Sequence, residues 1–284
     1  MSKSRWSTPA TDALRIEPGF RLADIDTRST PGYDGTKSHA AEALAAGAAP
    51  LSDLQERLFA QSVAGTATGS VLLVLQAMDT AGKGGIVRHV VGSVDPQGVE
   101  LASFKKPTAE ELEHDFLWRI EKRLPDAGRI GVFDRSHYED VLIGRVRRLA
   151  PEDEIERRYS AIVGFEAEAA AMGIRLVKVM LHISKDEQRD RLARRLDRPD
   201  KHWKYNPADV DERQLWDEYM DAYQVAIDRT STPVAPWHVI PADRKWYARL
   251  AVQQLLIDAL EDIGPSWPEA EYDVEEEKKR LAVS

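Results

Sequence analysis

Short apolar runs alternate along the chain with longer stretches that have helical periodicity. The first run, residues 71–75, contains no polar side chain, which is typical of a central strand covered on both faces. Similar runs predict four more strands, at residues 99–104, 130–133, 174–183 and 237–240. Strands that alternate with helices in this way predict an α/β fold with a mostly parallel five-stranded sheet. In such a sheet, ligands bind beyond the carboxyl ends of the strands.

Helices are predicted between and after these strands. Their ranges are residues 86–92, 109–123, 152–172, 209–229 and 243–263. Thr108 with Glu111, and Ser184 with Glu187, have the spacing of a capping box, in which two side chains satisfy free backbone groups at a helix start. A further short helix is predicted at residues 51–61, whose leucines fall on one face. Residues 1–50 are polar and lack a sustained period, so we expect an N-terminal arm and then one domain over residues 51–284.

The composition narrows the class of protein. With 43% hydrophobic and 31% charged residues, the chain can form a buried core and a charged surface. It has no cysteine, which excludes disulfides, thiol catalysis and zinc–thiolate sites. No apolar run reaches the roughly 20 residues of a membrane helix, and Met1 to Trp6 lead into polar sequence, so we expect no membrane partner and a cytoplasmic location. The net charge of −9 argues against general binding of nucleic acid.

A glycine-rich turn follows the first strand and precedes a helical stretch: Ala77-Met78-Asp79-Thr80-Ala81-Gly82-Lys83-Gly84-Gly85. A turn of this kind points backbone N–H groups toward an anion at the positive end of the helix dipole. Lys83 supplies a mobile positive charge for the outer phosphates. The position between a buried strand and a helix predicts a phosphate-binding loop (P-loop), with an ordinary surface turn as the alternative.

Two positions depart from the usual P-loop pattern. Ala77 stands where the first glycine normally lies, and Gly84 stands where a Ser or Thr hydroxyl would bind magnesium. The metal ligand must then come from elsewhere, and Asp79 offers an anionic oxygen that suits Mg²⁺. A carboxylate beside phosphates would repel them unless a cation lay between. The alternative is that Asp79 caps the following helix.

The third predicted strand runs into Asp134, which Arg135 and Ser136 follow. An apolar strand that ends in Asp brings a second carboxylate to the metal in many phosphotransferases. The Arg135 guanidinium could hold a transferring phosphoryl group through two parallel hydrogen bonds. The alternative is that Asp134 only caps the next helix.

Basic residues are concentrated after the fourth strand. Residues 188–204 hold seven basic and three acidic side chains, and Pro199 breaks the segment. This pattern predicts a helical lid at about residues 185–212, since basic lids in P-loop kinases close over phosphates and exclude water. Lys105 and Lys106 add two cations at the end of the second strand. The alternative is a solvated helix stabilised by ion pairs.

Taken in order, these motifs resemble those of the polyphosphate kinase 2 family over about residues 51–263. The resemblance rests on the following segments: Asp79-x-x-Gly82-Lys83-Gly84-Gly85, Asp134-Arg135-Ser136-His137-Tyr138-Glu139-Asp140, Arg195-Leu196-Asp197-Arg198-Pro199-x-Lys201-x-Trp203-Lys204 and Trp237-His238-Val239-Ile240-Pro241. It implies a P-loop, thymidylate-kinase-like three-layer sandwich that forms homo-oligomers, either dimers or tetramers. It also implies Mg²⁺-dependent, reversible transfer of phosphoryl groups between inorganic polyphosphate and adenine nucleotides. The run from Tyr138 to Leu142 resembles the branch that acts on both nucleoside mono- and diphosphates.

The resemblance further implies a role for individual residues. Asp79 and Asp134 would hold magnesium, and Lys83 and Arg135 would hold the transferring phosphoryl group. Arg195 would complete the catalytic set from the lid. The residues expected to bind phosphates or nucleotide are Gly82, Gly84, Gly85, Arg88, Lys105, Lys106, Tyr138, Glu139, Lys201 and Lys204.

Two other functions compete with this one. The first is a nucleoside monophosphate kinase that uses ATP as donor on the same scaffold. The cations at Lys105, Lys106 and the lid favour a longer polyanion than one nucleotide. The second is a phosphate-binding module without turnover, which would be expected to have a damaged metal site, whereas Asp79, Lys83 and Asp134 are all present.

Overall fold

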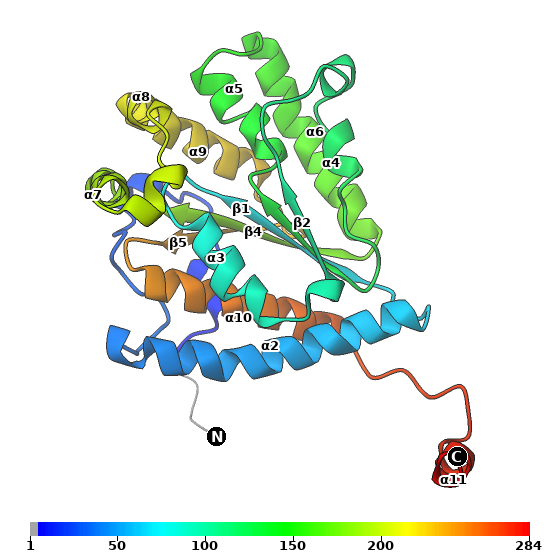
Figure 1. Ribbon diagram of the computed structural model, residues 1–284. Coiled ribbons are helices and arrows are strands. Elements are labelled where there is room, and N and C mark those ends of the chain that lie inside the picture. Colours follow the sequence, from blue (N-terminus) through cyan, green and yellow to red (C-terminus); the bar gives the residue numbers. More distant parts are fainter. Residues whose placement is uncertain (1–4) are drawn as a thin grey trace.

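The computed structural model describes residues 5–284 (Figure 1); the first four residues of the predicted arm lie outside this range. Its strands are β1 (Ser70–Gln76), β2 (Val99–Ser103), β3 (Ile130–Asp134), β4 (Ile174–His182) and β5 (Trp237–Pro241). They form one sheet in the order β2-β3-β1-β4-β5, and each neighbouring pair is parallel. Every residue of β1 is buried. The predicted α/β fold with a five-stranded parallel sheet is therefore confirmed.

Helices cover both faces of the sheet and make the three-layer sandwich. On one face lie α3 (Lys83–His89) and α10 (Lys245–Ile263), and on the other lie α6 (Glu152–Ala171) and α9 (Trp216–Thr230) (Figure 1). The long α2 (Ala40–Val63) packs on the outer side of α10. Because α3 follows β1 on one face and α6 follows β3 on the other, a crevice opens between the carboxyl ends of these two strands. The register places Leu75 beside Asp134, so both motifs reach that crevice.

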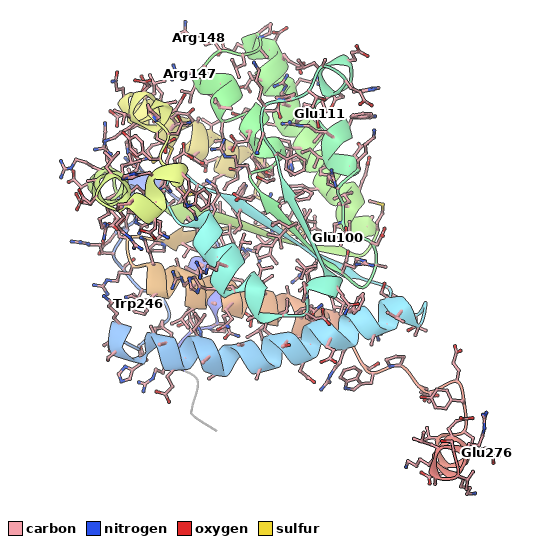
Figure 2. All side chains as sticks on the ribbon, viewed as in Figure 1. Glu100, Glu111, Arg147, Arg148, Trp246 and Glu276 are labelled. Atoms are coloured by element: carbon pink, nitrogen blue, oxygen red, sulfur yellow. The ribbon has the colours of Figure 1, made fainter. Side chains whose placement is uncertain are left out.

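The shorter elements complete the chain. The remaining α-helices are α1 (Ala10–Leu14), α4 (Trp118–Glu121), α5 (Ile143–Val146), α7 (Lys185–Leu196), α8 (Ala208–Gln214) and α11 (Val274–Ala282). The 3₁₀ turns are η1 (Leu22–Asp24), η2 (Lys37–His39), η3 (Val91–Ser93), η4 (Pro96–Gly98), η5 (Glu111–Glu113), η6 (His137–Asp140) and η7 (Pro199–Lys204). α11 projects away from the body, as Glu276 shows in Figure 2. No helix in residues 5–284 is both long enough and apolar enough to cross a membrane.

Three helix predictions need correction. The helix predicted at residues 51–61 begins at Ala40, so the proposed boundary after residue 50 falls inside α2. The alanine-rich segment before residue 51 lacks a sustained apolar period, yet alanine is itself strongly helix-forming, so the helix starts earlier than predicted. The stretch 109–123 contains only η5 and α4, because the turn around Asp115, whose carboxylate accepts a bond from the Leu117 N–H at 3.1 Å, interrupts it. The stretch 209–229 is two helices, α8 and α9, with a break at Leu215.

Candidate active site

The P-loop joins β1 to α3. Gly82 has φ 131°, a backbone conformation that side chains disfavour, and this turn starts α3 at Lys83. The Lys83 Nζ donates a hydrogen bond to the Ala77 carbonyl oxygen at 2.7 Å. Burial lowers the pKa of Lys83, and the negative charge of Asp79 partly opposes that shift. The lysine is thus a poorly hydrated cation held over the loop, which an incoming phosphate would stabilise.

The alternative roles proposed for the two carboxylates do not occur. α3 has Gly82 at its N-cap with no side-chain cap, so Asp79 does not cap it. The turn η6 is capped by Ser136, whose hydroxyl accepts a bond from the Tyr138 N–H at 3.2 Å, so Asp134 does not cap η6. Both aspartates instead line the crevice.

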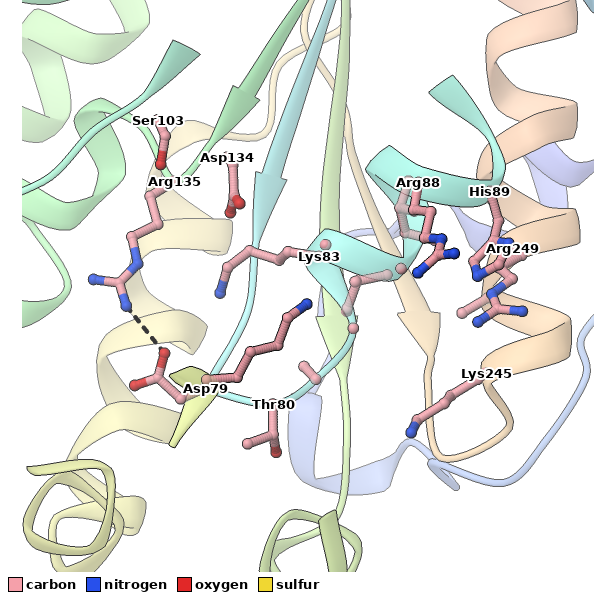
Figure 3. Close-up of a pocket in the computed structure, with 18 of the residues that line it drawn as sticks. Asp79, Thr80, Lys83, Arg88, His89, Ser103, Asp134, Arg135, Lys245 and Arg249 are labelled. Atoms are coloured by element: carbon pink, nitrogen blue, oxygen red, sulfur yellow. Dashed lines mark hydrogen bonds and ion pairs between the residues drawn. The ribbon is translucent and has the colours of Figure 1, made fainter. Parts of the chain in front are cut away.

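An ion pair links the P-loop to the end of β3. The Arg135 Nη2 donates to the Asp79 Oδ1 at 3.0 Å, and its Nη1 lies 3.6 Å from the Glu139 carboxylate (Figure 3). Arg135 has φ 66°, the left-handed region that non-glycine residues rarely adopt. The carboxylate of Asp134 has no hydrogen-bond or ion-pair partner within residues 5–284.

A cavity of 670 Å³ lies over the P-loop, and we call it the phosphate cavity. In Figure 3, Asp79, Asp134 and Arg135 lie on one side of the loop, and Arg88, Arg249 and Lys245 lie on the other. Asp79 and Asp134 are its only acidic lining residues within the described chain. Its basic lining residues are Lys83, Arg88, Lys105, Lys106, Arg135, Arg195, Lys201, Lys204, Lys245 and Arg249. The structure thus brings together all the predicted catalytic residues and all the predicted cations, and it adds Lys245 and Arg249 from α10.

The predicted lid is formed by α7, η7 and α8. Some of its cations are ion-paired on the surface, as the solvated-helix alternative required: Arg198 lies 2.8 Å and Lys201 lies 3.0 Å from Asp200. Arg195, Lys201 and Lys204 also line the phosphate cavity. The segment therefore combines both roles.

Arg191 anchors the lid to the P-loop, and the sequence reasoning did not assign it to the site. Its buried guanidinium donates to the carbonyl oxygens of Thr80 at 3.1 Å, Ala81 at 2.5 Å and Ala242 at 2.6 Å. It also pairs with Glu187 at 2.8 Å. The Glu187-to-Arg191 spacing of one helical turn was the available signal, because it predicts a pair on one face.

A second cavity of 200 Å³ lies across the Asp79–Arg135 pair, and we call it the acceptor cavity. Asp79 and Arg135 line both cavities. The other polar lining residues of the acceptor cavity are Glu139, Asn206, Asp209, Glu212, Tyr219 and Tyr223. Burial, together with the charge of Asp79, raises the pKa of Asp209 to about 6. The acceptor cavity is therefore acidic where the phosphate cavity is basic.

Two predicted ligand-binding residues lie outside the phosphate cavity. Tyr138 is fully buried and lines neither cavity, so its predicted role in binding is wrong. Its hydroxyl donates to Glu166 at 2.7 Å and accepts from Lys178 at 2.9 Å, which fixes η6 from behind. Glu139 lines the acceptor cavity and not the phosphate cavity.

The donor set fits a magnesium ion. Two carboxylates face one cavity, and Asp134 has no hydrogen-bond or ion-pair partner in the described chain, so its oxygens are available to a hard cation. A Cβ at Gly84 would meet no heavy atom within 4 Å, so a Ser or Thr would fit there. The usual hydroxyl ligand is therefore missing because of the sequence and not because of packing. No group of three acidic or histidine side chains within residues 5–284 could hold a metal without help. Waters and phosphate oxygens would have to complete an octahedron.

Comparisons with known proteins agree with the motifs. A family model described as polyphosphate kinase 2 matches residues 36–266. The chain is 45% identical over 259 residues to the AMP/ADP-polyphosphate phosphotransferase of Meiothermus ruber, with 90% of this chain and 95% of the relative covered. It is 46% identical over 273 residues to the ADP-polyphosphate phosphotransferase of Rhodopseudomonas palustris, with 91% and 92% covered.

Solved structures agree as well. The polyphosphate kinase 2 from Arthrobacter aurescens TC1 superposes with a TM-score of 0.96 at 56% identity, and the match covers 100% of both chains. Together with the family match over most of the sequence, this likeness confirms the resemblance carried by the P-loop, the β3 motif and the lid. The chain belongs to the polyphosphate kinase 2 family.

Proposed function

We propose that this protein transfers the terminal phosphoryl group of inorganic polyphosphate to AMP and ADP, reversibly and with Mg²⁺. The observation that carries the proposal is the contrast between the ten cations of the phosphate cavity and its two carboxylates. A site with so large an excess of positive charge needs a ligand with many negative charges. The names of the relatives from Meiothermus ruber and Rhodopseudomonas palustris support the same donor.

The two cavities divide the substrates between them. The polyphosphate lies in the phosphate cavity, and the nucleotide lies in the acceptor cavity with its phosphate toward Arg135. The adenine amino group and the ribose hydroxyls are hydrogen-bond donors, and they suit acceptors such as Glu139 and Glu212. Because Asp79 and Arg135 line both cavities, the reaction takes place beside them.

The reaction is a direct displacement. An oxygen of the nucleotide's terminal phosphate attacks the last phosphorus of the polyphosphate and forms the new P–O bond. The anhydride P–O bond breaks, and the shortened polyphosphate leaves with the electron pair. The chain's own residues position the groups and neutralise charge, since little covalent chemistry is required of the protein. Lys83 and Arg135 bind the oxygens of the phosphoryl group while it is transferred.

Asp79 and Asp134 would hold the magnesium ion. When bound, the ion neutralises the charge that develops on the phosphate oxygens. The Asp79 carboxylate accepts a hydrogen bond from Arg135, so its use as a metal ligand would compete with that bond. The Arg135 guanidinium would then be available to the phosphoryl group.

The donor is tested by mixing the protein with Mg²⁺, ADP and polyphosphate in the absence of any nucleoside triphosphate. We expect ATP to form. Activity seen only with ATP as donor would replace this proposal with the nucleoside monophosphate kinase.

The range of acceptors needs its own test. Relatives of nearly equal similarity are named for AMP with ADP and for ADP alone, and the resemblance of Tyr138 to Leu142 favours use of both. We expect AMP and polyphosphate to yield ADP and then ATP. If AMP is untouched while ADP is consumed, the protein belongs to the diphosphate-specific branch.

We also propose that the protein forms a homo-oligomer in the cytoplasm and has no nucleic-acid or membrane partner. Light scattering of the purified protein measures the oligomer. A monomer at assay concentrations would contradict that part alone.

A further inference from the structure

A third cavity, of 570 Å³, adjoins the phosphate cavity at the start of α10. We call it the arm cavity, because Gly35, Thr36 and Lys37 of the N-terminal arm form part of its wall. The two cavities share Lys245 and Arg249. The remaining lining residues are Glu187, Arg194, Asp243, Arg244 and Trp246, the last of which is labelled in Figure 2. One basic surface therefore runs from the P-loop to the arm.

Most of the positive charge in the arm cavity is unpaired. Lys37, Arg244, Lys245 and Arg249 make no ion pair with a carboxylate within residues 5–284. The two acidic lining residues are already engaged. Glu187 pairs with Arg191 at 2.8 Å and Arg194 at 2.9 Å, and Asp243 accepts bonds from Ser184 and Thr27, each at 2.9 Å. Uncompensated cations around a hollow are the expected lining of an anion site.

The position of two of these cations strengthens the argument. Lys245 is the first residue of α10 and Arg249 lies one turn later, beside the positive end of the helix dipole. The first turn of α10 contains no acidic residue. Partial burial and the nearby Arg191 and Arg194 lower the pKa of Lys245 to about 8. Cations crowded at a helix start destabilise the free protein, and an anion bound between them relieves the repulsion.

Hydrogen bonds join the arm to the first turn of α10 and to the residues just before it. The Asp243 N–H donates to the Thr27 carbonyl oxygen at 3.1 Å, and the Thr27 hydroxyl donates back to the Asp243 carboxylate at 2.9 Å. The Tyr247 hydroxyl donates to the Pro31 carbonyl oxygen at 2.7 Å. These bonds fix the stretch that leads to Lys37.

We propose that the arm cavity binds phosphates of a polyphosphate chain beyond those held at the P-loop, so that the arm sets a preference for long chains. This inference rests on the proposed function. A long chain with its end at Arg135 passes Lys83 and then follows Lys245 and Arg249 to Arg244 and Lys37. Tripolyphosphate held at the P-loop stops short of the arm.

The test is the double variant Lys37→Ala/Arg244→Ala, assayed with ADP and two donors. With long-chain polyphosphate we expect KM to rise about tenfold, as the loss of two exposed charge contacts allows. With tripolyphosphate we expect KM, kcat and the KM of ADP to stay within about twofold of the unmodified protein. Equal KM changes for both donors, or no change for either, would overturn the inference.

Two further variants serve as a control and as an independent test. Lys278→Ala/Lys279→Ala removes two charges from α11, far from the cavities, and should leave both KM values unchanged. Lys37→Glu, a single surface change, should raise the long-chain KM alone if the double variant is poorly folded. If the unmodified protein made no ATP from either donor, the proposed function would fail, which is a different outcome from loss of the chain-length effect.

Discussion

The phosphate cavity and the acceptor cavity share the Asp79–Arg135 pair and differ in nearly everything else. The first is lined by cations from the P-loop, the segment after β2, the lid and α10, many without partners. The second is lined by carboxylates and tyrosines that bond one another, as Tyr219 does with Glu212 at 2.6 Å. The unpaired cations of the phosphate cavity suit a charged ligand. The hydrogen-bonded polar groups of the acceptor cavity suit a ligand recognised by its shape and its hydrogen-bond donors. In the proposed reaction, the sign of the charge thus separates the donor side from the acceptor side.

The strongest test of this division is to remove the two negative charges that line the phosphate cavity. Asp134→Asn and Asp79→Asn keep the side-chain shape and lose the negative charge. Loss of a group that acts on transition-state charge lowers turnover by roughly 10²–10³. We expect both variants to fold normally and to lose activity on this scale, measured with saturating Mg²⁺. Asp153→Asn, on the exposed start of α6, is the control. Near-normal turnover in either variant would exclude that carboxylate from the metal site.

Lid cations should affect only the donor side. We expect Arg195→Ala and Lys201→Ala to raise the KM of polyphosphate by about tenfold and to change the KM of ADP little. The ion pair that Lys201 makes with the exposed Asp200 contributes about 0.5 kcal/mol or less, so Lys201→Ala should leave thermal unfolding nearly unchanged. Arg195 also lies 3.5 Å from the largely buried Asp209, so Arg195→Ala should lower the unfolding temperature slightly more. Arg189→Ala, a mostly exposed lid cation outside the cavities, is the control. Parallel losses of stability and affinity would indicate a structural ion-pair helix.

The affinity for polyphosphate should also fall at alkaline pH. The pKa of Lys245 is lowered to about 8, mainly by burial, so its charge is lost as the pH rises through that value. We expect the KM of polyphosphate to rise by about threefold between pH 7 and pH 9. Lys245→Arg should flatten this profile, and Lys106→Arg should leave it as it was. An unaltered profile in Lys245→Arg would assign the titration to another group.

On the acceptor side, we expect the stability of the folded protein to depend on pH. Burial and the charge of Asp79 raise the pKa of Asp209 from 3.8 to about 6. The folded protein therefore holds this proton more tightly than the unfolded chain, and its ionisation reduces stability as the pH rises from about 4 to 6. Asp209→Asn should be more stable than the unmodified protein by about 2 °C in Tm at pH 7.5 and equal to it near pH 4. A constant difference across this range would contradict the assignment.

The parts predicted well from the sequence are those that local patterns determine. The strands other than β2 are mainly apolar, and the P-loop lies where a buried strand meets a helix start. Lys245 and Arg249 could not be found in this way, because they lie far along the chain from Lys83 and only the sheet order brings them together. Their spacing of one turn on α10 was the sole local signal. Tyr138 shows a second limit: it is adjacent to Glu139, yet one side chain points into the core and the other into a cavity.

The left-handed backbone at Arg135 has a practical consequence for engineering. A non-glycine residue in that conformation costs about 1–2 kcal/mol, and a glycine there would be free of the strain. Arg135→Gly thus offers folding a gain while it removes the guanidinium that both cavities share. A screen for heat resistance alone would favour changes at such strained positions, and a catalyst selected in this way would be long-lived and inactive. Improved variants of this protein should be selected by turnover after heating, so that strain needed for activity is retained.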